Sequence, residues 1–356
     1  MNVLYGLLIL VPVALLSRYL GGPAVLTFGA AALGIVPLAA LLGRATEALA
    51  ERAGPRVSGL INGTLGNAAE LIITFFAIRA GLLELVKASI TGSILGNLLL
   101  VMGLSLLVGG LRHGLQKFDR TQAGLNATML MLAVIALGIP SLFSHAIEVG
   151  TGHMAVEYLS LGVAGAMLLV YVLSQFYLLR NGGGDSRPDV LHSRAPSGMS
   201  AWPLWKTLGG LALSTALIAW LSEVLVAAVE PVLEHLGWTE FFIGVVIIPL
   251  VGNTTEHLVA VQVAAKDEMD LSMGIAVGSG LQVALFVAPV LVFLSLAMGN
   301  PLTLVFNTFE LAALGAASII AALVSQDGES NWMEGVQLLV VYLILALAFY
   351  FLPTGG

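Results

Sequence analysis

The sequence contains no cysteine and few charged residues. Without cysteine, the chain can form no disulfide, thiolate metal site, iron–sulfur cluster or cysteine nucleophile. Charged residues make up 10% of its 356 residues, whereas a soluble globular protein carries roughly 25%. The 14 basic residues are outnumbered by 21 acidic residues, which argues against nucleic-acid binding. These shortages, together with a mean hydropathy of +0.98, exclude a soluble enzyme and indicate an integral membrane protein.

Long apolar runs, by contrast, are abundant. A helix needs about 20 apolar residues to cross a membrane, and continuous runs favour helices over the alternating segments of a transmembrane barrel. We therefore expect an all-α polytopic membrane protein with eleven transmembrane helices. The expected spans are 3–20, 24–43, 57–79, 86–110, 122–142, 155–179, 206–228, 239–264, 271–296, 301–324 and 332–352.

The loops predict the orientation of the chain. The longest polar connection, 181–205, is rich in glycine, proline and serine, which is typical of a flexible linker. Even-numbered loops carry eleven of the 14 Lys and Arg residues, and odd-numbered loops carry three. Because basic residues favour the cytoplasmic side, we expect a cytoplasmic N-terminus and linker and an outside C-terminus. No cleavage site follows the first span, so we expect a retained helix and a prokaryotic plasma membrane.

An internal repeat divides the chain. A shift of 186 positions superposes Gly66–Glu70 on Gly252–Glu256, and the same shift superposes Gly92-Ser93 on Gly278-Ser279. Five spans separate the copies, and an odd number turns the second copy over, as in the inverted repeats of secondary transporters. Substrate sites in such folds lie near the midplane, where the repeats meet. The expected parts are an extra helix at 1–20, five-helix repeats at 21–180 and 206–356, and the linker 181–205.

Glu70 and Glu256 are the repeated residues with the clearest chemistry. Each falls within an apolar span, where a charged side chain costs about 2.5–3.5 kcal/mol on insertion scales. One such glutamate could be protonated and simply hydrogen-bond between helices, but two at matching positions favour a shared site. Calcium and similar hard cations are bound by six to eight oxygens from carboxylates, carbonyls and amides. The pair therefore predicts a divalent cation site.

The Gly-Asn steps before the two glutamates offer further oxygens. Backbone carbonyls at Gly66 and Gly252 become available if the helices are broken there, and Asn62-Gly63 and Pro249 lie within about a turn of those steps. Discontinuous helices of this kind form ion sites in transporters. With no thiolate, and with His257 the only histidine at this depth, a zinc or copper site is disfavoured.

The same carboxylates can couple cation binding to protons. A carboxylate in a low-dielectric pocket favours its neutral form, and a bound divalent cation displaces the proton. Exchange of two protons for one divalent cation moves no net charge, whereas coupling to three sodium ions would be electrogenic. The two glutamates and their Gly-Asn steps are compatible with either coupling.

Polar residues on the neighbouring span of each half are Ser93, Asn97, Ser279 and Gln282. In a membrane helix such groups often hydrogen-bond between helices. For Ser93 and Ser279 this interpretation stands beside one in which they line the site. Gln282 is bulkier and costlier to bury, which favours the site.

Two further titratable residues lie inside the spans. His257 is either a packing histidine or a proton-relay candidate. Glu310 is an intramembrane carboxylate about a third of the way into its span. It has no acidic counterpart in the first copy of the repeat.

Five stretches carry a family resemblance: Gly43–Glu47, Asn62–Ile72, Val86–Leu95, Gly252–His257 and Asp327–Trp332. With these motifs the sequence resembles, over nearly its whole length, the Ca²⁺/H⁺ antiporters (CAX family) of the cation/Ca²⁺ exchanger superfamily. The resemblance implies an alternating-access exchanger in which two helices slide across a fixed core of eight. Sodium-coupled relatives tend to have a Pro-Glu step and an aspartate in the repeats. Neither is seen here, which favours protons.

The resemblance also implies a ligand set and partners. Glu70 and Glu256 would be the central cation and proton ligands. The other implied site residues are Gly66, Asn67, Ser93, Gly252, Asn253, Ser279 and Gln282. Calcium would be the transported substrate rather than a cofactor, and the expected partners are Ca²⁺, protons and the lipid bilayer.

Three alternatives remain on the sequence. A sodium-coupled or potassium-linked exchanger of calcium or another divalent cation would differ in the gradient that drives transport. An ion channel would use the polar residues to line a continuous pore, and saturable counter-transport would exclude it. An intramembrane metalloenzyme would want a motif such as His-Glu-x-x-His, which Thr255–Leu258 does not supply. We therefore expect no enzymatic activity.

Overall fold

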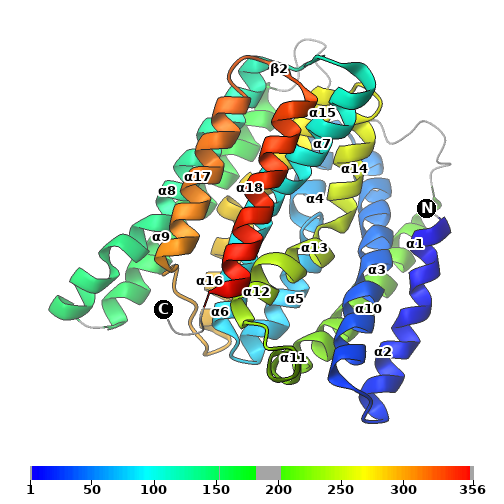
Figure 1. Ribbon diagram of the computed structural model, residues 1–356, viewed down its shortest axis with the longest axis vertical. Coiled ribbons are helices and arrows are strands. Elements are labelled where there is room, and N and C mark those ends of the chain that lie inside the picture. Colours follow the sequence, from blue (N-terminus) through cyan, green and yellow to red (C-terminus); the bar gives the residue numbers. More distant parts are fainter. Residues whose placement is uncertain (1, 152, 182–201, 353–356) are drawn as a thin grey trace.

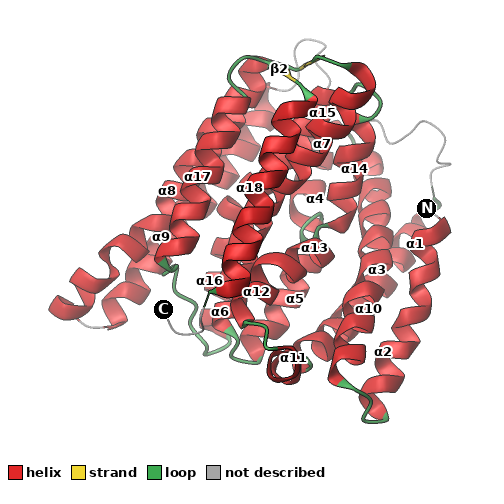
Figure 2. Cartoon of the chain, in the orientation of Figure 1, coloured by secondary structure: helices red, strands yellow, loops and turns green. Residues whose placement is uncertain are grey.

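The computed structural model describes residues 2–151, 153–181 and 202–352 (Figure 1). These residues are almost entirely helical, with one short antiparallel ribbon of β1 (Gln116–Lys117) and β2 (Glu329–Ser330) (Figure 2). The ribbon and the turn at 265–268 lie together at the top of Figure 1, and we call this the ribbon end. The opposite end, which includes the turns at 80–82 and 298–300, is called the far end.

The length and composition of the helices are those of an all-α polytopic membrane protein. Among the described residues, eight helices are long and apolar enough to cross a membrane. The number is nine if Val229–Leu236 and Glu240–Gly252, which meet at a bend of 117°, form one span. Two shorter apolar helices, Leu4–Tyr19 and Thr308–Val324, accompany them. The total of eleven spans and their division into repeats stay predictions.

The first half follows the expected spans closely. Its helices are α1 (Asn2–Gly6), η1 (Leu7–Ile9), α2 (Leu10–Tyr19), α3 (Ala24–Ala53), α4 (Pro55–Leu65), α5 (Ala68–Arg79), α6 (Leu83–Leu95), η2 (Gly96–Val101), α7 (Met102–His113), α8 (Arg120–Thr151) and α9 (His153–Asn181). Helix α3 is longer than expected because the polar stretch Gly43–Glu47 continues the helix. Of the expected linker 181–205, residues 182–201 lie outside the described residues.

The second half contains more and shorter helices than its five expected spans. Its helices are α10 (Leu204–Ala227), α11 (Val229–Leu236), α12 (Glu240–Phe242), η3 (Ile243–Ile247), α13 (Ile248–Gly252), α14 (Thr254–Ala264), α15 (Met269–Gln282), η4 (Val283–Val287), α16 (Ala288–Ala297), α17 (Thr308–Val324) and α18 (Trp332–Phe351). The segments η2, η3 and η4 are π-helical. Such turns are rare and often occur at functional sites.

Both Gly-Asn steps interrupt their spans. Helix α4 ends before Gly66 and α5 begins after Asn67, while α13 ends at Gly252 and α14 begins after Asn253. The two asparagines have similar non-helical backbone angles, with φ −89° and ψ 11° at Asn67 and φ −107° and ψ 11° at Asn253. The chain runs from α4 toward the far end through α5, but from α13 toward the ribbon end through α14 (Figure 1). The predicted discontinuous helices are therefore present, and they run in opposite directions.

The span expected at 301–324 is helical only in its second part. Residues 301–306 are extended and bury every second side chain, namely Leu302, Leu304 and Phe306. Helix α17 begins after Asn307, which forms a capping box with Glu310. The prediction of a helix over the whole range was wrong, because hydropathy alone does not separate a buried extended segment from a helix. Glu310 accordingly lies in the first helical turn.

Close packing joins α6 to the π segment η3. A Cβ atom at Gly92 would overlap the backbone carbonyl of Val245, and one at Gly244 would lie 2.5 Å from the Cβ of Ala88. Only glycine permits such an approach of two backbones, as small residues do at helix contacts in membranes. Helix α6 and η3 therefore pack closely against each other at Gly92 and Gly244.

Candidate cation site

Glu70 lies in the first turn of α5 and is fully buried. The Ser93 hydroxyl of α6 donates a short hydrogen bond to Glu70 Oε1. The amide of Asn253, from the break of the other half, donates to Ser93 Oγ at 3.1 Å. A chain of three polar side chains thus connects the second break to the first carboxylate.

Glu256 lies in the first turn of α14 and retains partial exposure. The Ser279 hydroxyl of α15 donates to Glu256 Oε2 at 2.5 Å. The amide of Asn97, in the π segment η2, donates to Ser279 Oγ at 3.0 Å. The second carboxylate therefore also receives a serine that is itself held by an asparagine of the other half.

The two motif copies meet across the breaks. A Cβ atom at Gly66 would lie 3.2 Å from Glu256 Oε1, and one at Gly252 would lie 3.4 Å from the Cβ of Glu70. Each glutamate therefore lies against the glycine of the other motif. Both carboxylates also stand at helix N-termini, whose partial positive charge favours an anionic group. This arrangement brings two carboxylates together and compensates part of their charge.

Asn67 and Gln282 form a further contact between the halves. Asn67 Nδ2 donates to Gln282 Oε1 at 2.9 Å, and the Asn67 side chain is fully buried. With this contact, each of the nine sequence-predicted site residues forms a hydrogen bond or a close glycine contact with another of the nine. Their role in binding an ion stays a prediction.

Several buried oxygens in this cluster lack hydrogen-bond partners among the described residues. They are Glu70 Oε2, Asn67 Oδ1, Asn97 Oδ1 and Asn253 Oδ1. Leaving a buried acceptor unpaired costs about 1–3 kcal/mol. One carboxylate oxygen and three amide oxygens are the donor types that hard divalent cations prefer. The residues present therefore fit such a cation as substrate.

His257 adjoins Glu256 in sequence, but its Nε2 atom has no hydrogen-bond partner in the described part of the chain. Its role as a proton relay stays a prediction. Across the described ranges, no group of three or more His, Asp or Glu side chains is arranged to hold a metal ion. The cluster is thus a two-carboxylate site supplemented by amides and hydroxyls.

Asn97 belongs to this cluster, although the sequence predicts it only as a polar neighbour and not as one of the ligands. Its amide donates a hydrogen bond to Ser279, just as the amide of Asn253 donates to Ser93. Its spacing of four from Ser93 would have put both on one face of a regular helix, which is a usable signal.

Exposure differs between the two sides of the breaks. Gly66, Glu256 and Gln282 keep partial exposure, whereas Glu70 and Asn253 are buried. Helices α4 and α14 lie on the ribbon-end side of the breaks, and α5 and α13 lie on the far-end side (Figure 1). The carboxylate on the ribbon-end side is therefore the less covered of the two.

Comparison with known proteins gives a consistent result. The sodium/calcium exchanger protein family matches residues 23–180 and 206–351. A Ca²⁺/H⁺ antiporter of Aphanothece halophytica is 43% identical over 99% of this chain and 97% of its own length. The Ca²⁺/H⁺ antiporter ChaA of Bacillus subtilis is 42% identical over 96% of this chain and 97% of its own length.

Solved structures agree. Native YfkE has a TM-score of 0.85 and 39% sequence identity, with 98% of this chain and 100% of that chain covered. The H⁺/Ca²⁺ exchanger CAX has a TM-score of 0.72 at 17% identity over 98% of this chain and 91% of that chain, which shows a shared fold. The resemblance noted in the sequence is confirmed by these matches, and the chain belongs to the sodium/calcium exchanger protein family.

Proposed function

We propose that this protein exchanges Ca²⁺ for protons across a membrane, with Glu70 and Glu256 as the shared cation and proton ligands. One observation carries the proposal. Two carboxylates from oppositely running half-helices meet at the helix breaks, each bound by a serine and surrounded by unpaired buried amide oxygens. The names of full-length relatives, Ca²⁺/H⁺ antiporters at 42–43% identity, support calcium and protons as the exchanged ions.

The chemistry follows from competition for the same oxygens. Ca²⁺ binds the charged carboxylates, and a proton neutralises them, so one ligand leaves as the other arrives. If each glutamate releases one proton per Ca²⁺, the exchange is electroneutral. The Asn67, Asn97 and Asn253 amides supply neutral oxygens that serve the cation without binding protons.

Alternating access follows from the proposed architecture. Two inverted repeats, 21–180 and 206–356, would place the site at the midplane, with helix 1–20 outside them and the linker 181–205 between them. Helices α3 and α10 pack along each other, and α10 also packs on α5. A Cβ atom at Gly43 of α3 would contact the side chain of Thr255, so the two helices lie close together there. Sliding of this pair past the breaks would expose the two glutamates in turn.

The orientation completes the proposal. The basic loops put the ribbon end in the cytoplasm and the C-terminus outside, in a prokaryotic plasma membrane. Partial exposure of Glu256 on the ribbon-end side would then correspond to a site that opens toward the cytoplasm. The closed packing of Gly92 on Val245 would seal the opposite face.

Transport by the purified protein tests the proposal. Reconstituted liposomes would receive radioactive Ca²⁺ under an outward proton gradient, or under an outward sodium gradient with pH clamped. Uptake with protons alone supports Ca²⁺/H⁺ exchange. Uptake with sodium alone would overturn the coupling ion, passive uptake without either gradient would indicate a channel, and no uptake would redirect the test to other divalent cations.

A further inference from the structure

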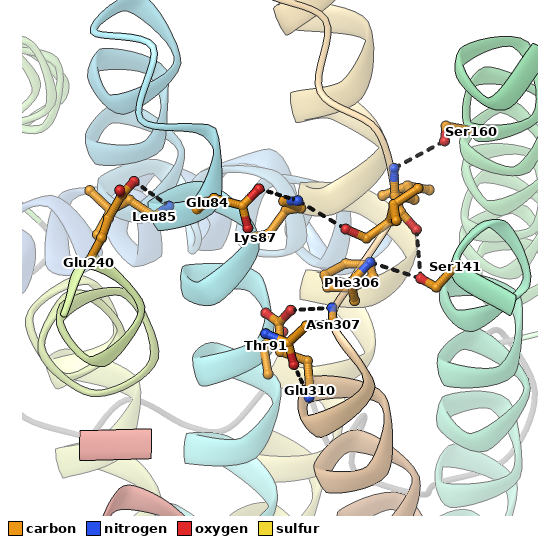
Figure 3. A network of polar contacts seen from close by, with 12 residues as sticks. Glu84, Leu85, Lys87, Thr91, Ser141, Ser160, Glu240, Phe306, Asn307 and Glu310 are labelled. Atoms are coloured by element: carbon orange, nitrogen blue, oxygen red, sulfur yellow. Dashed lines mark hydrogen bonds and ion pairs between the residues drawn. The ribbon is translucent and has the colours of Figure 1, made fainter. Parts of the chain in front are cut away.

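Glu310 is a buried carboxylate outside the candidate site. Its side chain is 1% exposed and lies between α17 and α6 (Figure 3). Thr91 Oγ1 of α6 donates to Glu310 Oε1 at 2.9 Å, and the backbone N–H of Asn307 donates to Oε2 at 2.8 Å. One carboxylate therefore serves two elements, because it caps α17 and also holds α6.

A polar stripe on α6 leads to this carboxylate from the far end. Glu84, Lys87 and Thr91 share one helix face through spacings of three and four, and their exposure falls from 64% to 12% to 0%. Lys87 Nζ also donates to the carbonyl of Val305 at 3.0 Å (Figure 3). Charged and polar residues that lead inward from the far end are also what the entrance of an ion pathway would contain.

The stripe does not reach the cation site. The next residues on the same face, Ile94 and Leu95, are apolar and fully buried. Ser93, which contacts Glu70, lies about 200° from Thr91 around the helix at 3.6 residues per turn. The polar side chains of this face therefore end at Thr91, and their contacts join α6 to neighbouring elements.

Helix α6 is held from several directions at once. Glu240 Oε1 accepts from the backbone N–H of Leu85 in its first turn at 2.9 Å (Figure 3). Gly92 allows no movement toward Val245, and Thr91 is bound to Glu310. These contacts fix the rotation of α6 about its axis, and that rotation decides where the Ser93 hydroxyl points.

The other half offers no equivalent of this contact. The 186-residue offset puts Val277 at the position matching Thr91, and Gly124 at the position matching Glu310. Neither residue has a side chain that can form the hydrogen bond. The contact therefore holds only α6, the helix whose Ser93 serves the buried carboxylate Glu70, although Glu310 itself comes from the other half.

We propose that Glu310 is a positioning residue for the cation site: through Thr91 it fixes the rotation of α6 and thereby the Ser93 hydroxyl against Glu70. The proposal rests on the proposed exchange function, because it concerns the same site. It assigns Glu310 no ion or proton to carry. The hydrogen bond itself is what matters.

The experiment compares variants that keep or remove this bond, using Ca²⁺ uptake driven by a proton gradient in liposomes. Thr91→Val removes the hydroxyl at nearly constant volume, and Thr91→Ser keeps it. Glu310→Gln keeps both contacts, because its oxygen accepts from Asn307 and its amide donates to the Thr91 hydroxyl. Ser318→Ala is the matched control, because this buried hydroxyl of α17 donates, among the described residues, to Gly315 O within its own helix.

Thr91→Val should raise the Ca²⁺ concentration for half-maximal uptake about threefold to tenfold, less than the roughly 10–100-fold typical of groups bonded directly to a metal ligand. The maximal rate should change less. Thr91→Ser, Glu310→Gln and Ser318→Ala should stay within about twofold of wild type, since each preserves the bond between α6 and α17. In a Ser93→Ala background, Thr91→Val should have no further effect, because both changes act through one hydroxyl.

Other outcomes overturn the positioning role. If Thr91→Val leaves the Ca²⁺ concentration for half-maximal uptake unchanged, Glu310 is not a positioning residue. Loss of transport in Glu310→Gln would make Glu310 an ion carrier instead. If Thr91→Val and Thr91→Ala fail to give monodisperse protein while Ser318→Ala succeeds, the contact serves folding only. Failure of the wild-type protein to exchange Ca²⁺ would instead refute the proposed function, so the two failures are distinguishable.

Discussion

Glu70 and Glu256 occupy matching positions in two similar motifs, yet their surroundings differ. Glu70 is fully buried, and its serine is held by Asn253. Glu256 is partly exposed, and its serine is held by Asn97. By the repeat, Asn67 would be expected to hold Ser279, but it donates to Gln282.

The difference has its origin in two positions outside the motifs. Asn97 matches Val283 in the other half, and Gln282 matches Gly96. Gln282 takes the Asn67 amide as its donor, and Asn97 supplies the amide that Ser279 receives. The motif therefore determines where the helix breaks, whereas the neighbouring helix determines which amide serves each carboxylate.

Replacing either carboxylate should have the largest effect. Glu70→Gln and Glu256→Gln should each abolish proton-driven Ca²⁺ uptake while the protein stays folded, because an amide neither carries the charge that Ca²⁺ needs nor exchanges a proton. Ca²⁺ uptake into liposomes measures the loss of transport, and thermal unfolding with and without Ca²⁺ measures whether the protein stays folded. Wild-type transport by one variant would show that the two glutamates do not have equivalent roles, and it would assign exchange to the other glutamate alone.

Proton competition should be the next largest effect. Protonated carboxylates do not bind Ca²⁺, so lowering the pH should raise the half-saturating Ca²⁺ concentration. If both glutamates release a proton, the change approaches about 100-fold per pH unit where both are protonated in the ion-free state, and about tenfold if only one does. Ca²⁺ titrations at several pH values on both membrane faces measure this slope. A flat profile would exclude protons as competitors.

The serines offer a direct comparison of the two halves. Ser93→Ala and Ser279→Ala should each raise the half-saturating Ca²⁺ concentration by about 10–100-fold, because each removes the hydrogen bond that orients a ligand carboxylate. We expect the larger change for Ser93, whose glutamate is fully buried. Ser318→Ala serves as the control. A larger change at Ser279 would contradict the expectation that the more deeply buried carboxylate depends more on its serine.

The smallest expected effect comes from making the halves more alike. Asn97→Val introduces the residue found at the matching position 283 and removes the donor to Ser279. The half-saturating Ca²⁺ concentration should rise about threefold to tenfold, because Asn97 either orients a carboxylate through Ser279 or supplies one of several oxygens. This rise should be independent of a Thr91→Val change, because Thr91 acts through Ser93 on Glu70 whereas Asn97 acts through Ser279 on Glu256. Strong coupling between the two variants would mean that the two carboxylates do not act separately.

The breaks and the two glutamates could be predicted from the sequence because the repeated pentapeptide combines glycine, a helix-breaking Asn and an otherwise costly charge. Hydropathy also indicated most spans, since membrane helices need continuous apolar runs. The partners of the serines could not be predicted. The partner of Ser279, Asn97, lies in the π segment η2, whose extra residue per turn rotates side chains by an amount that a regular helical pattern does not predict. The partner of Ser93, Asn253, lies at the break of the other half.

The extended segment is a different case, because its signals are in the sequence. Leu302, Leu304 and Phe306 alternate with outward residues, which is the pattern of an extended chain. Asn307 and Glu310 have the spacing of a capping box, which marks a helix start. A twenty-residue hydropathy window averages over both signals. The capping box alone predicts a helix start at 308, which is where α17 begins.

That extended segment also has a consequence for the order of assembly. The backbone N–H groups of Leu304 and Phe306 are satisfied by the hydroxyls of Ser160 and Ser141, and the carbonyl of Val305 is satisfied by Lys87. In lipid, an unsatisfied backbone group costs several kcal/mol. Residues 301–307 therefore become stable only when α6, α8 and α9 are present. Synthesis from the N-terminus makes those helices first, so the ribosome delivers the segment after the partners that it requires.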